Sequence, residues 1–243
     1  MQLLNLRMRN IIYFLSFILS ISLLSCNKEK EEIKSLYFDK EYYEKPLLDI
    51  KQSIQFQGNA DKYEILVENT KILEASIKED KLEILTKKKG ATTIYLRNSL
   101  ANETESISIK VIDSYMGLSV ERPISSSLYA YSDKMFFINN KTNDVYWYDD
   151  SFKLKKKGNY NFYLKDEKFY LSLSFDKDSI IYDISNSSNI FLFKVLPDLL
   201  DISWSKLTSR EISPINIVAI NINSSEKTYF SLSKDEMPYN TIY

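Results

Sequence analysis

Apolar and polar residues alternate along much of the first half of the chain, and the apolar positions fall on matched parities. Those positions are Leu48, Ile50, Ile54 and Phe56, then Tyr63, Ile65 and Val67, then Leu82 and Ile84, then Ile94 and Leu96, and then Ile107, Ile109 and Val111. A period of two is typical of half-buried antiparallel strands, whereas an amphipathic helix repeats every 3.6 residues. Turn residues separate the runs, as at 58–61 and 87–90. Residues 35–113 are therefore predicted to form a β-sandwich.

The second half, residues 114–243, carries shorter runs that are rich in aromatic and β-branched residues. The predicted strands are 134–139, 144–148, 159–164, 168–175, 179–184, 215–222 and 228–232. Tight polar links such as 140–143 join neighbours, and such links favour antiparallel pairing. One helical turn is expected over 196–201, with Pro197 near its start. The whole chain is thus predicted to be all-β, with an antiparallel β-meander or small barrel after the sandwich.

The N-terminus has a different pattern. Arg7 and Arg9 precede an apolar run, residues 11–24, which only serines interrupt. A basic region followed by a short apolar region indicates a secretory signal peptide. The alternative is a membrane-spanning helix, but such a run covers only about 21 Å as a helix, less than the roughly 30 Å hydrocarbon core. Residues 1–25 are therefore predicted to be a signal peptide.

The signal segment ends in Leu23-Leu24-Ser25-Cys26. This sequence resembles the lipobox of bacterial lipoproteins, although Leu24 is bulkier than the usual residue at its position. The resemblance implies cleavage before Cys26, a lipid on its sulfur and a further acyl chain such as palmitate. Two or three chains hold a protein firmly on a membrane, since each buried CH₂ contributes about 0.8 kcal/mol.

Residues 26–34 read as a charged tether without an apolar pattern. Lysines and acids directly after the cysteine resemble the export signal of surface lipoproteins of the Bacteroidota; a plain spacer is the alternative. The resemblance implies an outer-membrane lipoprotein at the cell surface, with the periplasmic face as the alternative.

Residues 63–69, 72–77, 82–84 and 89–96 follow one another in an order that resembles a group 2 bacterial Ig-like domain, and Ser106–Val111 matches the last strand of that family. Gly90 stands where the backbone of the turn needs a positive φ. The resemblance implies an Ig-like spacer or adhesion module without catalytic residues. Residues 114–243 resemble the uncharacterised C-terminal parts of Bacteroidota lipoproteins, which implies no activity.

Composition narrows the function classes. The chain has no histidine, one cysteine and a formal net charge of −1. The commonest general base and metal ligand is missing, and zinc–thiolate sites and internal disulfides are excluded by count. There is no basic excess for binding nucleic acid. We therefore expect that the protein is not an enzyme and that it binds no cofactor and no metal. A carboxylate hydrolase is the remaining enzymatic alternative, with a pair among Asp149, Asp150, Asp176 and Asp178.

Tyr146, Trp147 and Tyr148 are candidate ligand-binding residues, because adjacent aromatics suit sugar stacking. On a strand the two tyrosines face one way and the tryptophan the other, so one set is expected in the core and the other exposed. Ser179 is a candidate O-glycosylation site, since Asp178-Ser179-Ile180 resembles the acceptor motif of Bacteroidota.

The first functional hypothesis is a non-enzymatic surface lipoprotein, in which an Ig-like stalk presents a β domain to a protein partner. A glycan-binding accessory lipoprotein that uses exposed aromatics near Trp147 is the alternative. The boundary between the halves is expected near Asp113–Met116, with few and polar contacts across it.

Overall fold

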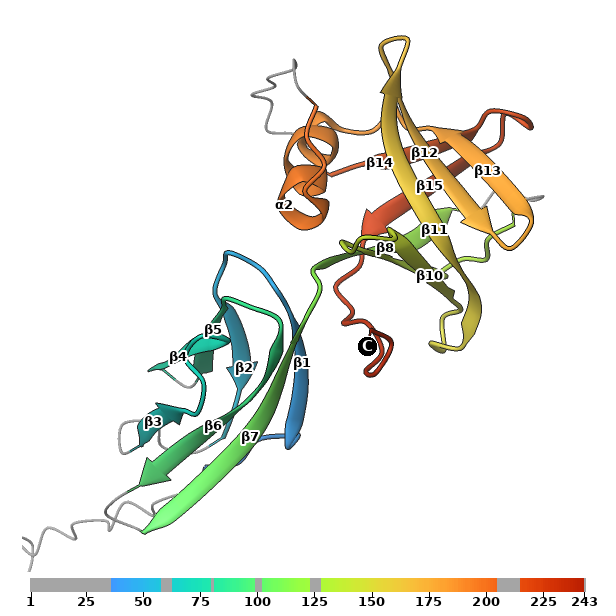
Figure 1. The fold of residues 1–243 in the computed structure, drawn as a ribbon. Coiled ribbons are helices and arrows are strands. Elements are labelled where there is room, and N and C mark those ends of the chain that lie inside the picture. Colours follow the sequence, from blue (N-terminus) through green and yellow to red (C-terminus); the bar gives the residue numbers. More distant parts are fainter. Residues whose placement is uncertain are drawn as a thin grey trace, which may run out of the picture.

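The structure is a computed structural model that describes residues 36–57, 63–79, 81–98, 102–122, 128–204 and 215–242. Its architecture is all-β, as predicted, and consists of a sandwich of two sheets followed by a closed barrel (Figure 1). The signal peptide, the tether and Cys26 lie outside the described residues.

The sandwich packs a four-stranded sheet against a three-stranded one. The first sheet has the order β1 (Tyr42–Pro46), β7 (Glu103–Ile112), β6 (Gly90–Asn98) and β3 (Glu64–Val67). The second has the order β2 (Gln52–Gln55), β5 (Lys81–Thr86) and β4 (Leu73–Lys78). β1 pairs in parallel with β7, and the other neighbours are antiparallel.

The core of the sandwich comes from the predicted alternation. Leu82, Ile84, Ile94 and Leu96 are fully buried, as is Ile109. These side chains stand on the inner faces of β5, β6 and β7 and fill the space between the sheets. Gly90 begins β6 with φ of +146°, which confirms that its turn needs a positive φ.

One part of this pattern is wrong. The alternation predicts Ile50 on the same buried face as Ile54 and Phe56, but Ile50 lies before β2 and is 63% exposed. The strand begins only at Gln52, so the alternation does not extend back to Ile50. Strand β1 was not expected from the sequence.

The barrel is an up-and-down meander of eight strands. They are β8 (Tyr115–Arg122), β9 (Lys134–Ile138), β10 (Asp144–Tyr148), β11 (Leu154–Lys165), β12 (Lys168–Phe175), β13 (Asp178–Asp183), β14 (Ile217–Asn221) and β15 (Lys227–Leu232). Each strand pairs antiparallel with the next, and β15 pairs with β8 to close the ring. Closure leaves no free edge between the barrel strands.

Side chains fill the interior of the barrel. The buried cluster includes Phe137, Trp147, Tyr160, Phe162 and Phe175. An eight-stranded barrel is just wide enough to be filled in this way. Aromatic side chains suit this space because each buries a large area.

Two segments cover the ends of the barrel. The helical turn η2 (Phe191–Val195) and helix α2 (Leu196–Leu200) follow β13 and bury Phe191, Leu196 and Leu200 in the core. At the other end, residues 128–133 precede β9 and bury Tyr129 in the same core. Helix α2 matches the predicted helical turn, with Pro197 near its start.

The link between sandwich and barrel is short. β7 ends at Ile112 and β8 begins at Tyr115, and the two strands belong to different sheets. The main buried clusters of sandwich and barrel share no residue. A third, smaller cluster lies at the junction and combines Ile112 with residues of the outer barrel wall and of residues 233–242, which we call the C-terminal tail.

Candidate functional site

Trp147 points into the barrel and is 3% exposed. Its ring makes an edge contact with Tyr129, with 5.0 Å between centroids, and packs near Phe175. The indole Nε1 donates a hydrogen bond of 3.0 Å to Asp133. Trp147 therefore belongs to the core, and no face of its ring is open for stacking on a sugar.

Tyr146 and Tyr148 point outward from β10, as strand geometry requires, yet they are only 7% and 4% exposed. The C-terminal tail covers them. The hydroxyl of Tyr148 lies 3.1 Å from the hydroxyl of Thr241, and Met237 and Ile242 belong to the same buried cluster. The expectation that one of the two faces is exposed is wrong, because a distant segment covers the outer face.

A buried polar network stabilises the end of the barrel that residues 128–133 cover. The carboxylate of Asp133 is 1% exposed and pairs with Lys155 Nζ at 2.8 Å, while the backbone N–H of Ala130 donates to it at 2.9 Å. Lys155 also lies 5.1 Å from the centre of the Trp147 ring. A buried carboxylate is tolerated when charge and hydrogen bonds satisfy it, as they do here. Sequence analysis missed Asp133, which no motif singles out.

Tyr129 and Tyr182 extend this network across the barrel. Their hydroxyl oxygens lie 2.7 Å apart in the interior. Burial raises the pKa of Tyr129 well above its usual range, and the neighbouring Tyr182 adds to the effect. Burial also raises the pKa of Tyr182. Both phenols are therefore held neutral, and their contact ties residues 128–133 to strand β13 of the barrel wall.

The four candidate carboxylates lie at turns. Asp149 Oδ1 accepts hydrogen bonds from the backbone N–H groups of Ser151 and Lys153, which closes the turn after β10. Asp176 has φ of +51° in the turn between β12 and β13, and Asp178 begins β13. No group of three or more acidic or cysteine side chains in the described ranges is arranged to hold a metal ion.

Ser179 is the second residue of β13, exposed on the barrel wall, where it pairs with Ser174 of β12. An exposed hydroxyl is accessible to a glycosyltransferase, so the structure is compatible with modification at this position. O-glycosylation of Ser179 stays a prediction.

The junction holds several charged groups in mutual contact. The carboxylate of Glu44 is 2% exposed and accepts hydrogen bonds from Tyr42 Oη at 2.8 Å and from the backbone N–H of Asn240 at 3.2 Å. Lys110 Nζ lies 3.3 Å from it. Burial, together with the hydrogen bond to Glu44, raises the pKa of Tyr42 to about 12. Glu44 thus connects two strands of the sandwich with the tail that comes from the barrel.

A groove of about 900 Å³ lies beside this junction. Leu48 and Ile50 line it from the sandwich, and Pro197, Leu199 and Ile215 line it from the barrel. Its walls therefore come from both halves of the molecule, and its shape depends on how the halves are held. Nothing in the sequence pattern indicates this groove, because its lining residues are far apart in the chain.

Comparisons with known proteins add little. No family model matches the chain, and no curated protein matches it. Among solved structures, the chain is similar to domains 5–6 of the S-layer protein SbsC, with 9% identity over 62% of this chain and 96% of that chain, at a TM-score of 0.27. A structure of domains 4–9 of the same protein gives 10% identity over 62% of this chain and 31% of that chain, also at a TM-score of 0.27. At such scores the likeness carries no argument about fold or function.

Within the part of the chain that the structure describes, no helix combines the length and the apolar character that crossing a membrane requires.

Proposed function

We propose that this chain is a non-enzymatic lipoprotein of the outer membrane, in which the sandwich is a stalk that presents the barrel at the cell surface to a partner. The sandwich would be an Ig-like spacer, and Cys26 would carry the lipid. The lipobox-like sequence before Cys26 supports the anchor, and the order of the halves supports the roles of stalk and head.

The observation that best supports this proposal is that the chain enters the sandwich at one end and leaves it at the opposite end. The backbone N–H of Leu36, the first described residue, donates to Tyr63 Oη at 3.1 Å. Tyr63 in turn lies 3.3 Å from the carboxylate of Glu103, where β7 begins. β7 then runs 10 residues to Ile112, next to the barrel. At the usual rise per residue, that strand spans about 33 Å.

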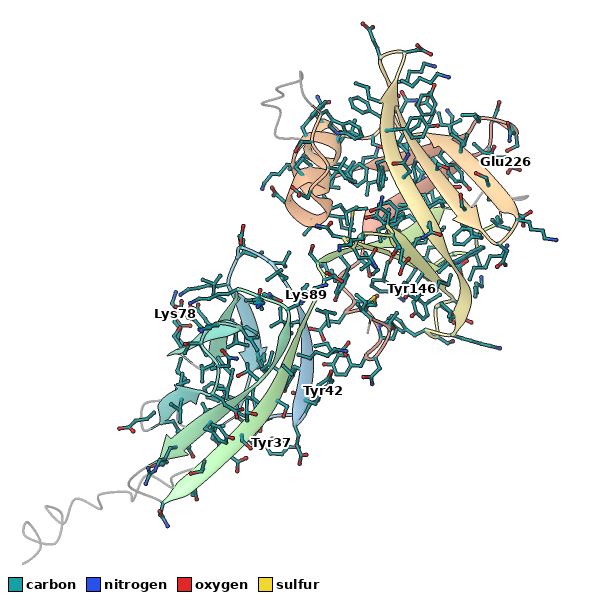
Figure 2. The ribbon with its side chains drawn as sticks, viewed as in Figure 1. Tyr37, Tyr42, Lys78, Lys89, Tyr146 and Glu226 are labelled. Atoms are coloured by element: carbon teal, nitrogen blue, oxygen red, sulfur yellow. The ribbon has the colours of Figure 1, made fainter. Side chains whose placement is uncertain are left out.

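This geometry suits a stalk. An anchor that precedes Leu36 enters at the end of the sandwich away from the barrel, and the barrel is then held outward from the membrane. Figure 2 shows Tyr37 on the sandwich and Glu226 at the far side of the barrel. The filled interior of the barrel favours recognition of a partner by the outer surface over enclosure of a small ligand.

The anchor is tested with Cys26→Ser. The wild-type chain is expected to incorporate labelled palmitate and to lose residues 1–25, because the thiol of Cys26 accepts the lipid before cleavage. The variant is expected to lose the label and to keep the signal segment. Palmitate incorporation at the wild-type level in Cys26→Ser would overturn the lipoprotein proposal.

Surface exposure is tested separately. Alanines at residues 28–32 replace the uninterrupted run of charged residues in the tether. If these residues are an export signal, protease added to whole cells digests the wild-type protein and spares the variant. A conservative set, Lys28→Arg and Lys30→Arg, is the matched control and is expected to leave the protein accessible. Equal digestion of all three proteins would make the tether a plain spacer.

A further inference from the structure

The C-terminal tail makes polar contacts with the sandwich. Glu236 pairs with Lys45 of β1 at 2.6 Å, and the Lys45 side chain is only 9% exposed. The backbone N–H of Asn240 donates to the buried carboxylate of Glu44, and Lys110 of β7 donates to the carbonyl of Ile242 at 2.9 Å. The tail therefore contacts the two strands at one edge of the four-stranded sheet, β1 and β7.

The same tail is also bound to the barrel from which it comes. The backbone N–H of Met237 donates to Tyr115 Oη of β8 at 3.2 Å. Met237 and Ile242 are 3% and 7% exposed and pack with Phe136 and Tyr148 of the outer wall. Because the tail is fixed on the barrel by apolar burial, its contacts with the sandwich transmit orientation from one half to the other.

The covalent link alone would not fix this orientation. Only Asp113 and Ser114 separate β7 from β8, and domains joined by a short link move relative to one another unless an interface holds them. The contacts at the tail are costly to break, because the buried Lys45 would lose its carboxylate partner Glu236 and the buried Glu44 would lose the N–H of Asn240. In Figure 1 the red end of the chain lies between the sandwich and the barrel.

We propose that the C-terminal tail is a strap that locks sandwich and barrel at one angle, so that the two halves act as a rigid rod and the groove between them keeps one width. Glu236, Asn240 and Ile242 are among the residues that hold the strap to the sandwich. The inference concerns the orientation of the halves and holds whether or not Cys26 carries lipid.

The test measures the distance between two spin labels in the full-length chain. Replacing Cys26 by serine removes the only cysteine, and Lys78→Cys and Lys177→Cys then place one label on each half. Both lysines are exposed, Lys78 at the end of β4 and Lys177 in the turn between β12 and β13. A locked molecule gives a narrow distribution of distances, and an unlocked one gives a broad distribution.

Charge reversal at one contact unlocks the strap. Glu236→Lys sets two ammonium groups against each other at Lys45, and we expect the distribution to broaden about twofold as the halves regain their freedom. Adding Lys45→Glu restores an ion pair with reversed charges and is expected to restore the narrow distribution. Chains that end after Ser233 lack the strap and are expected to show the broadest distribution.

Asp235→Lys is the matched control. This neighbouring acid pairs with Lys134 of β9 at 3.4 Å and accepts a hydrogen bond from the hydroxyl of Ser233. Among the described residues, these partners lie outside the sandwich. The same change of charge, one position away, is expected to leave the distribution narrow. Equal widths in the wild type, Glu236→Lys and the shortened chain would overturn the strap. So would broadening in Glu236→Lys that the added Lys45→Glu does not reverse.

Discussion

The sandwich and the barrel fill their cores with different kinds of residue. Most of the fully buried residues of the sandwich are leucines and isoleucines, such as Leu82, Ile84 and Ile94. The barrel instead buries Phe137, Trp147 and other aromatic rings in its centre. Two sheets packed face to face leave a layer about 10 Å thick, which aliphatic side chains from both faces fill. The interior of a closed ring of eight strands is wider at its axis and requires larger side chains.

The two interiors also differ in their polar groups. In the barrel, Asp133, Trp147, Tyr129 and Tyr182 form hydrogen bonds inside the molecule. In the sandwich, the buried charges Glu44 and Lys45 lie on β1, at the side where the tail arrives. A buried polar network specifies one arrangement because breaking it leaves unsatisfied groups. The network in the barrel stabilises one end of the barrel itself, whereas the buried charges of the sandwich bind the C-terminal tail.

The largest loss of stability is expected when a large side chain at the centre of the barrel core is removed. Trp147→Ala deletes a 3% exposed indole and removes the hydrogen bond that its Nε1 donates to the buried Asp133. We expect a loss of about 3–5 kcal/mol in the free energy of unfolding of the barrel. Fluorescence of Trp204, the other tryptophan, follows unfolding in urea, because it packs on Phe169 in the barrel. Hydrogen exchange along β6 should stay at the wild-type rate; faster exchange there would mean that the halves unfold as one unit.

The reciprocal change acts on the sandwich. Leu96→Ala empties a fully buried position in β6, and we expect a loss of about 2–5 kcal/mol from the sandwich. Faster hydrogen exchange in β6 and β7 measures it. The matched control is Leu66→Ala on the neighbouring strand β3, where the side chain is 65% exposed and the expected change is within about 0.5 kcal/mol. A shift of the tryptophan transition in Leu96→Ala would contradict separate cores.

The strands were predictable from the sequence where one face is buried within its own half. Ile107, Ile109 and Val111 alternate with exposed or half-buried residues on β7, and the structure buries all three. Strand β8 was missed although it carries the same signal, since Met116, Leu118 and Val120 are buried alternately. That pattern identifies a strand, but its pairing with β15 joins residues more than a hundred positions apart.

The candidate site was less predictable, for a physical reason visible on β10. Period two correctly puts Trp147 on one face and Tyr146 and Tyr148 on the other. Alternation cannot indicate whether an outer face contacts water or another segment. The tail that covers Tyr148 has no regular pattern, and its Met237, Thr241 and Ile242 contact the barrel only through tertiary folding.

The smallest effect on stability per residue is expected from a change of pH, because each tyrosine ionises only in part when the pH is close to its pKa. Burial raises the pKa of Tyr160 in the barrel, and burial with the bond to Glu44 raises the pKa of Tyr42 at the junction to about 12. An unfolded tyrosine titrates near 10. The fold therefore favours the neutral phenol, so its stabilisation is complete below about pH 10 and is lost as the pH rises towards 12.

We expect the urea midpoint, followed by circular dichroism, to fall between about pH 9 and 11. Tyr160→Phe removes one group with a raised pKa from the barrel core, so the midpoint of this variant should depend less steeply on pH. Tyr131→Phe is the matched control, because Tyr131 is 67% exposed and its removal should leave the slope unchanged. Both variants keep every lysine, so lysine titration cancels in the comparison. Equal slopes in Tyr160→Phe and Tyr131→Phe would mean that the buried phenols of the barrel do not set its alkaline limit.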